Sequence, residues 1–149
     1  MGKLVEAKVV HKFKASPEQV FDAWLEESLV ITWMSATLKS LNLSGDIRRV
    51  EIDAQVGGTF TFSDMRESGE AVHWGTYREI DRPHKLVFTW FTSAEDEQED
   101  LSVVTLTIVP DGSGSIATIV HSFDARYAEY IPQTEKGWGG MLAQIDLLK

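Results

Sequence analysis

Histidine is the residue type in this chain most able to do chemistry, because its ring binds metals and transfers protons near neutral pH. The four histidines, His11, His73, His84 and His121, lack the i, i+4 spacing of a helical metal pair, and the chain has no cysteine. The sequence therefore predicts no metal site and no cysteine nucleophile. His11 and His121 fall in register with apolar neighbours, which favours buried, hydrogen-bonded rings; rings that line a pocket are the alternative.

Serine and glycine motifs offer no catalytic site either. Ser113 lies in a Gly-Ser-Gly sequence without the full G-x-S-x-G pattern, between two alternating segments, and is interpreted as part of a hairpin turn. The pair Gly57-Gly58 opens a strand rather than a helix, which favours a bulge or tight corner over a phosphate-binding loop. The sequence predicts no catalytic residue and no cofactor, and it favours a non-catalytic protein over an enzyme.

Apolar residues recur with two different spacings, one typical of strands and one typical of helices, and these spacings predict the secondary-structure elements that would position the residues above. Residues 4–14 alternate apolar and polar side chains, which predicts a half-buried strand. The segment 16–19 (Ser-Pro-Glu-Gln) is a helix-start signal, followed by one short helix to about Trp24 and a second over about 27–33. Six further strands are expected at about 47–55, 58–64, 71–81, 85–92, 102–110 and 115–123. Their short, turn-forming connections require antiparallel pairing.

The C-terminal segment returns to helical spacing. Its apolar stripe contains Trp138, Met141, Leu142, Ile145 and Leu148. Pro132 predicts a break near residues 131–132, after which the longer helix begins. Glycines on either side of Trp138 would each cost about 1 kcal/mol relative to alanine, and we expect a close approach of the helix backbone to the sheet to offset that cost. The predicted fold is α+β, with a curved seven-stranded antiparallel sheet around a long C-terminal helix and two short helices after the first strand.

Composition limits the environment and the partners of the protein. Lys and Arg total 14 against 23 Asp and Glu, a formal charge of −9, which disfavours nucleic acid as a partner. No apolar run approaches the roughly 18 residues of a membrane-spanning helix, and no secretory signal precedes the first strand. We therefore expect a cytoplasmic protein without membrane insertion, forming a single domain over residues 1–149. The acidic segment 95–100 is interpreted as a solvated loop, with a docking segment as the alternative.

Aromatic residues suggest where a small molecule would bind. The chain has five Trp, seven Phe and three Tyr, and many of them would face the interior between the sheet and the long helix. Thr134 and Glu135 interrupt the apolar stripe of that helix, as expected if the interior is partly hollow. The predicted ligand-binding residues are His11, Trp33, Phe60, Phe62, Trp74, Tyr77, Phe88, Trp90, His121, Thr134, Glu135, Trp138, Met141 and Leu142. Core packing is the alternative interpretation of each aromatic residue.

The order of elements and several motifs resemble a known superfamily. The matching residues are 15–24, 56–60, 75–80, 86–90 and 136–138, together with Trp33, His121 and Leu142. They resemble the SRPBCC superfamily, also called START-like or Bet v-like, and within it the homologues of the C-terminal domain of Aha-type activators of the heat-shock protein 90 ATPase. The resemblance implies a helix-grip fold, in which the sheet wraps around the long helix and a cavity opens between them.

Three functions are consistent with these observations. The first is binding of a small apolar ligand, aromatic or lipid-like, between the sheet and the C-terminal helix. The second, implied by the resemblance, is a co-chaperone-like interaction module in the stress response, with a chaperone as partner. The third is a cavity enzyme of the cyclase type, which would require His11 or His121 to be accessible and to titrate near neutrality.

Overall fold

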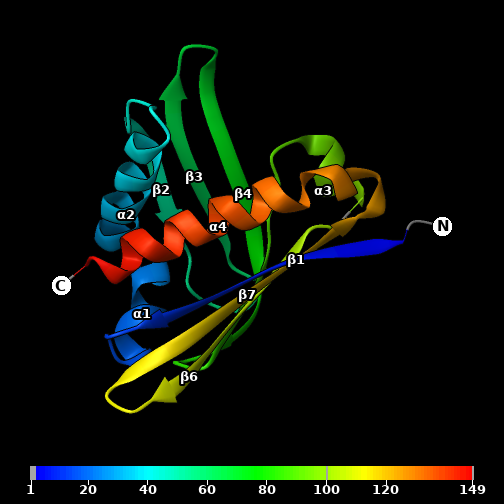
Figure 1. The fold of residues 1–149 in the computed structure, drawn as a ribbon. Helices are drawn as coiled ribbons and strands as arrows, with labels where there is room; N and C mark the ends of the chain where they lie inside the picture. Colours follow the sequence, from blue (N-terminus) through cyan, green and yellow to red (C-terminus); the bar gives the residue numbers. More distant parts are fainter. Residues whose placement is uncertain (1–2, 100, 149) are drawn as a thin grey trace.

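The computed structural model describes residues 3–99 and 101–148, which form an α+β fold (Figure 1). The strands are β1 (Leu4–Phe13), β2 (Ile47–Ile52), β3 (Thr59–Arg66), β4 (Gly69–Asp81), β5 (Lys85–Thr89), β6 (Val103–Asp111) and β7 (Gly114–Asp124). The helices are α1 (Pro17–Leu25), α2 (Glu27–Ser40), α3 (Ala94–Glu99), the 3-10 helix η1 (Ala125–Tyr130) and α4 (Ile131–Asp146). The predicted seven strands and long C-terminal helix are confirmed.

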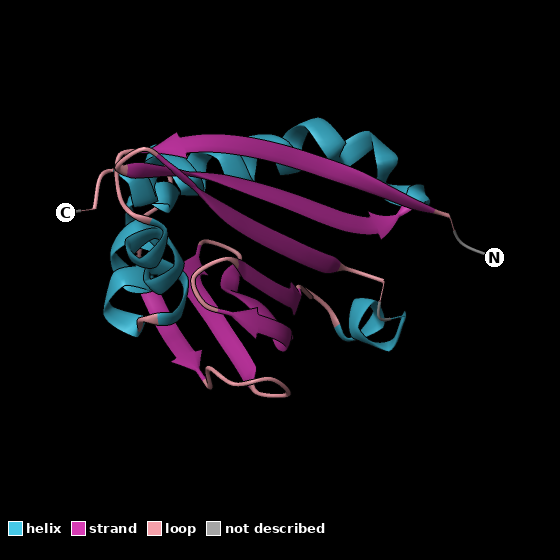
Figure 2. Ribbon diagram, turned by 90° about the horizontal axis from the view of Figure 1, so that it is seen from below, coloured by secondary structure: helices cyan, strands magenta, loops and turns pink. Residues whose placement is uncertain are grey.

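The sheet is curved and antiparallel throughout. Its strand order is β1-β7-β6-β5-β4-β3-β2, so every strand from β2 to β7 pairs with its neighbour in sequence. The first strand returns to pair with β7 along its whole length, from Leu4 opposite Asp124 to Phe13 opposite Ser115. The α4 helix crosses the concave face, with α1 and α2 at one end of it and α3 at the other (Figures 1 and 2).

The start of α1 follows the predicted signal. Ser16 accepts a hydrogen bond from the backbone N–H of Gln19, and the Gln19 side chain accepts one from the backbone N–H of Ser16, which completes a capping box. The next helix, α2, continues to Ser40, seven residues beyond the predicted end at Trp33. Met34, Thr37 and Leu38 are all buried, at the i, i+3, i+4 spacing of a helix face. The predicted end was wrong because Thr37 interrupts the apolar pattern, and its hydroxyl is satisfied by the Trp33 carbonyl at 2.7 Å.

The acidic segment differs from the prediction in its local structure. Residues 94–99 form α3 rather than a loop, and the described side chains of Glu95, Glu97 and Gln98 are exposed. Asp100, the last residue of the predicted loop, lies outside the described residues. Charge repulsion along the segment led to the expectation of a loop, but solvent screens exposed charges within a short helix.

The predicted break before the long helix is present. The glycines of that helix, however, do not pack closely against the sheet as predicted. The segment η1 ends at Tyr130 and α4 begins at Ile131, with Pro132 in its first turn. A Cβ built at Gly137 or Gly140 meets no atom within 4 Å, and one at Gly139 meets only the Val9 side chain at 3.7 Å. The expected close approach of helix backbone to sheet is therefore wrong for these positions.

Because Gly137 has room for a side chain, Gly137→Ala is expected to stabilise the protein. The alanine gains about 1 kcal/mol of helix propensity without a steric cost. Chemical denaturation should show a rise in the free energy of unfolding of about that size. A loss of stability instead would show that α4 depends on the backbone freedom of this glycine.

Candidate functional site

The space beneath the middle of α4 is filled by aromatic side chains. Trp138 of α4 packs on Trp24 of α1, with ring centroids 6.0 Å apart. Below them, predicted site residues and their neighbours enclose a void of only about 10 Å³; its lining consists of Trp24, Phe60, Phe62, Tyr77, Leu86 and Phe88. A void of this size accommodates a single water molecule at most. Four of the predicted ligand-binding residues, Phe60, Phe62, Tyr77 and Phe88, thus form core packing around this void.

A larger cavity lies at the end of the fold where η1 enters α4, next to α3. Its volume is about 410 Å³, and its walls come from α3 and the segments on either side of it, from β7, from η1 and from the first turn of α4. The lining residues are Trp90, Thr92, Ser93, Glu95, Leu101, Ser102, His121, Phe123, Asp124, Tyr127, Tyr130 and Thr134. We call this space the η1 cavity. It contains three of the predicted ligand-binding residues, Trp90, His121 and Thr134.

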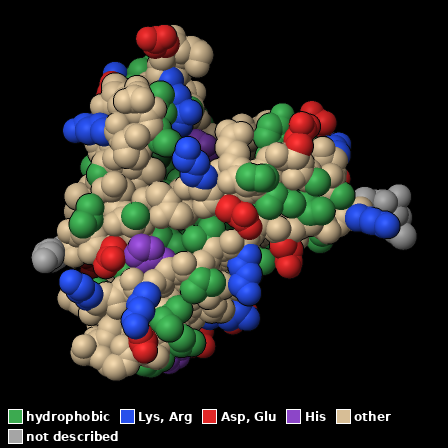
Figure 3. All heavy atoms as spheres, viewed as in Figure 1, with side chains coloured by type: hydrophobic (Ala, Val, Ile, Leu, Met, Phe, Trp, Pro, Cys, Tyr) green, Lys and Arg blue, Asp and Glu red, His purple; other side chains and the backbone are tan. Residues whose placement is uncertain are grey.

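The lining of the η1 cavity combines aromatic surface with uncharged polar groups. Trp90, Phe123 and two tyrosines supply ring surface, while serine and threonine hydroxyls supply hydrogen-bonding groups. Glu95 and Asp124 are its charged residues, and neither Lys nor Arg is among the described residues that line it. Hydrophobic side chains also gather on the surface where η1 meets α4, and Tyr130 there is 48% exposed (Figure 3).

His121 is a polar residue of the η1 cavity with a hydrogen-bond partner at each ring nitrogen. It lies on the inward face of β7, between Ile119 and Phe123, and is 7% exposed. The indole N–H of Trp138 donates to His121 Nδ1 at 3.1 Å, and His121 Nε2 lies 2.8 Å from Ser102 Oγ. Burial lowers the pKa of His121 to about 4, because the apolar surroundings disfavour the charged ring. The ring is therefore neutral at pH 7.

A second, smaller cavity of about 120 Å³ lies between α2, β3, β4 and α4. Its lining includes the predicted site residues Trp33, Phe62, Trp90 and Met141. His73 lines it too, stacked on Trp90 with ring centroids 5.0 Å apart. Burial, together with the nearby Arg66, lowers the pKa of His73, which keeps this ring neutral as well. Trp90 contacts both cavities, so the conformation of this one indole affects both volumes.

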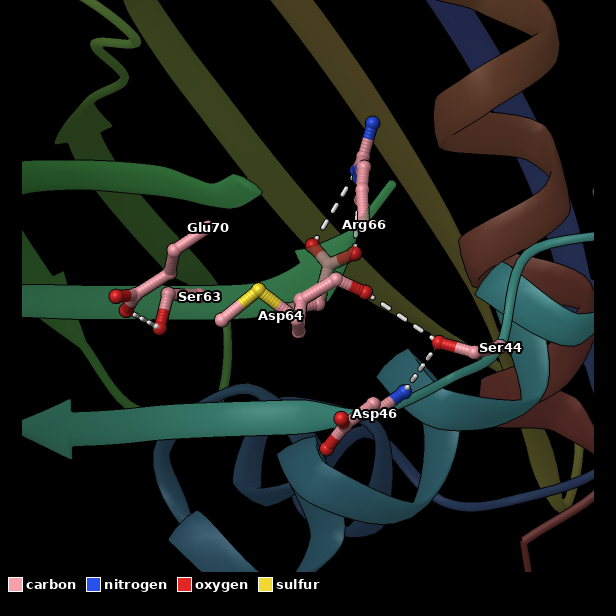
Figure 4. Close-up of polar contacts among 7 residues, drawn as sticks. Ser44, Asp46, Ser63, Asp64, Arg66 and Glu70 are labelled. Atoms are coloured by element: carbon pink, nitrogen blue, oxygen red, sulfur yellow. Dashed lines mark hydrogen bonds and ion pairs between the residues drawn. The ribbon is translucent and has the colours of Figure 1, made fainter. Parts of the chain in front are cut away.

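A charged pair borders the smaller cavity (Figure 4). Asp64 on β3 is 1% exposed and accepts hydrogen bonds from Arg66 Nε at 2.8 Å and from Arg66 Nη2 at 3.3 Å. A buried carboxylate is costly unless it is paired in this way. Ser63 lies beside this pair in the sequence but donates to Glu70 instead (Figure 4). The Asp64–Arg66 contact therefore stabilises β3 and leaves little free charge for a ligand.

The remaining predicted site residues are not among the lining of either cavity. His11 pairs with Asp146 at 3.1 Å, which links β1 to the C-terminal end of α4. Glu135 accepts a hydrogen bond from the backbone N–H of Lys8 at 2.9 Å. Trp74 forms an isolated bridge with Phe91. Trp138 and Leu142 are buried in the hydrophobic core.

Several cavity residues were absent from the sequence prediction. Tyr127 and Tyr130 precede Thr134 by seven and four residues, a helical spacing that could have identified them, since it extends the inward stripe of α4 backward. Ser102 carries no such signal. It lies nineteen residues before His121 in sequence, and only the pairing of β6 with β7 brings the two together.

Within residues 3–99 and 101–148, no group of three His, Cys, Asp or Glu side chains is placed to hold a metal ion. None of the helices among the described residues is long and apolar enough to cross a membrane. On the face shown in Figure 3, charges of both signs are interspersed rather than gathered into a basic patch.

Known structures share this architecture. A protein of unknown function from Staphylococcus aureus superposes with a TM-score of 0.78 at 18% identity, over 97% of this chain and 92% of that one. A protein from Rhodobacter sphaeroides superposes with a TM-score of 0.76 at 18% identity, over 97% of this chain and 89% of that one. The solution structure of the Aha1 dimer from Colwellia psychrerythraea superposes with a TM-score of 0.71 at 15% identity, over 95% of this chain and 93% of that one. The comparison with curated proteins returned no match.

The fold is the START-like helix-grip architecture that the sequence motifs implied, with the sheet wrapped around a C-terminal helix. The family model described as "Activator of Hsp90 ATPase homolog 1-like protein" matches residues 14–148. The chain belongs to this family, and the resemblance seen in its sequence motifs is confirmed.

Proposed function

We propose that this protein binds a small, uncharged, mainly aromatic ligand in the η1 cavity. The observation that carries the proposal is the cavity itself, because about 410 Å³ with aromatic walls and a few hydroxyls falls within the usual range of ligand sites. A ligand would gain roughly 25 cal/mol for each Å² of apolar surface that it buries there.

The charge of the lining favours a neutral ligand over an anionic one. Glu95 and Asp124 are the charged residues of the lining, and Arg126 Nε already pairs with the Asp124 carboxylate at 3.9 Å, so a fatty-acid carboxylate would have to compete with Asp124 for that guanidinium. The Asp124 carboxylate accepts a hydrogen bond from the backbone N–H of Arg126 at 2.9 Å, which holds it at the cavity wall. Within the broader expectation of an aromatic or lipid-like ligand, this lining supports the aromatic class.

A thermal-shift panel of neutral polycyclic aromatics, flavonoids, sterols and fatty acids tests the proposal. A ligand present at a hundred times its Kd should stabilise the folded state by about 2.7 kcal/mol. We expect the neutral aromatics to raise Tm and the fatty acids to have little effect. If no compound raises Tm, the proposed function is wrong.

Two tryptophan substitutions on the same turn of α4 locate the site. Thr134→Trp places a large side chain in the η1 cavity and should abolish the thermal shift, whereas Gln133→Trp adds the same side chain at an exposed position. A shift that survives Thr134→Trp would place the ligand elsewhere.

A second candidate function is interaction with a chaperone of the Hsp90 class, favoured by the family description and by the exposed acidic side chains of α3. The test is the ATPase rate of purified Hsp90 with and without the protein. We expect any stimulation to fall in a Glu95→Gln/Glu97→Gln variant. No stimulation by the unaltered protein would exclude this activity.

Histidine catalysis has less support than binding. It requires a ring that titrates near neutrality, but the pKa of His121 is lowered to about 4. His11 pairs with Asp146 and is not among the residues that line the η1 cavity. We therefore propose binding without a catalytic step.

A further inference from the structure

The hydrogen bonds of His121 have a defined direction. An indole N–H can only donate, so the contact of Trp138 Nε1 with His121 Nδ1 requires a lone pair on Nδ1. In the neutral ring the proton must then lie on Nε2. Nε2 therefore donates to Ser102 Oγ, 2.8 Å away, and the Ser102 oxygen accepts. The two hydrogen bonds therefore run in one direction, from Trp138 as donor through His121 to Ser102 as acceptor.

This direction leaves the Ser102 hydroxyl proton unused. A serine hydroxyl can accept and also donate one hydrogen bond. Ser102 Oγ has His121 as its hydrogen-bond partner, and within residues 3–99 and 101–148 its hydroxyl forms no hydrogen bond to a second group. Ser102 lines the η1 cavity, so the proton is available to whatever occupies that space. Successive donors in such a chain polarise one another, which strengthens the final donor.

We propose that the η1 cavity selects neutral aromatic ligands that carry a carbonyl oxygen, and that Ser102 recognises this oxygen by donating its hydroxyl proton. The inference rests on the proposed function of the cavity and adds the group that a ligand must carry. A carbonyl fits because it accepts without bringing a negative charge towards Glu95 and Asp124. Trp138 acts as a positioning residue, since it is not among the residues that line the cavity, and His121, which does line it, fixes the role of Ser102 through its Nε2 proton.

The same direction argues against a serine nucleophile. An attacking serine needs a base that takes its proton, which here would require a lone pair on His121 Nε2. Nε2 carries the proton instead, because Trp138 occupies the lone pair of Nδ1. The three residues thus form a donor chain that ends in the cavity, and they do not form a catalytic pair.

A matched pair of probes tests the inference: 2-acetylnaphthalene, an aromatic ketone, and 2-ethylnaphthalene, its hydrocarbon counterpart of similar shape. Calorimetric or fluorescence titration gives Kd for each. Ser102→Ala should weaken ketone binding about tenfold, the effect of one lost hydrogen bond, and leave hydrocarbon binding unchanged. Thr134→Val removes another hydroxyl from the same cavity and should leave the ketone preference intact.

The outcomes distinguish a failure of the carbonyl inference from a failure of the proposed binding function. If both probes bind and Ser102→Ala weakens them equally, the carbonyl inference is wrong and the binding function stands. If neither the probes nor the wider panel binds, the proposed function is wrong and the inference falls with it. The tautomer of His121 gives a readout that needs no ligand, because nitrogen NMR distinguishes a proton on Nε2 from one on Nδ1. A proton on Nδ1 would overturn the inference.

Discussion

Gly75→Ala is expected to lower the free energy of unfolding by about 3 kcal/mol, the upper part of the usual range for overpacking. A Cβ at this position would lie 1.9 Å from the carbonyl oxygen of Thr89 and 2.8 Å from the Phe60 ring. The nearest obstacle is backbone, which cannot rotate away as a flexible side chain can. Strand β4 must therefore move relative to the end of β5, where Thr89 lies.

The strain from Gly75→Ala would also reach the cavities. Thr89 precedes Trp90, and the Thr89 hydroxyl accepts a hydrogen bond from the backbone N–H of Thr76 at 2.8 Å. Displacing this segment displaces Trp90, which lines both cavities. Urea denaturation gives the stability change, and probe binding gives the functional one. Gly137→Ala, expected to stabilise, serves as the matched control; equal effects of the two alanines would contradict the steric argument.

The second large effect is a loss of stability on acidification that originates in His121. Its pKa falls from 6.5 to about 4 on burial. Between these two values the unfolded chain binds a proton that the folded protein does not, so the free energy of unfolding decreases as the pH falls. At about 1.36 kcal/mol per unit of pKa, the full loss is about 3 kcal/mol. The stability is fully present above pH 6.5 and is lost by about pH 4.

Comparison with a variant isolates this contribution. His73 has a lowered pKa as well, and Asp22 and Glu70 add an acid dependence of their own, so the total slope is a sum of several groups. His121→Gln removes the ring while keeping an acceptor for Trp138, and its stability should fall less steeply between pH 6.5 and 4.5. NMR titration of the His121 ring in the unaltered protein should give a midpoint near pH 4. A midpoint near 6.5 would contradict the proposed environment.

The η1 cavity and the smaller cavity beside α2 give the interior of this helix-grip fold a different form from the single hollow that the sequence suggested. The aromatic core around Phe60 and Phe88 fills the centre, while hollows remain towards α3 and towards α2. The Trp90 side chain lines both of these cavities.

Local signals in the sequence were sufficient for most of the architecture. Alternation over residues 4–14 and the Gly-Ser-Gly turn at 112–114 each depend on a few adjacent residues, and both correspond to elements of the structure. The capping box of Ser16 and Gln19 is equally local. The prediction was wrong where a local pattern was interrupted, as at Thr37 in α2, or misinterpreted, as in the acidic α3. The glycines of α4 show the same limit, since the space around a glycine depends on distant residues.

The sequence by itself determined the class of fold, the antiparallel pairing of consecutive strands from β2 to β7 and the inward stripe of the C-terminal helix, because periodicity and turn chemistry act over short distances. Only the tertiary structure decided which aromatic residues fill the interior and which leave space, because cavity volume depends on side chains from many elements packing together. It also brought Ser102 to His121 and Trp138. The polar chain proposed to select the ligand exists only once β6, β7 and α4 are assembled.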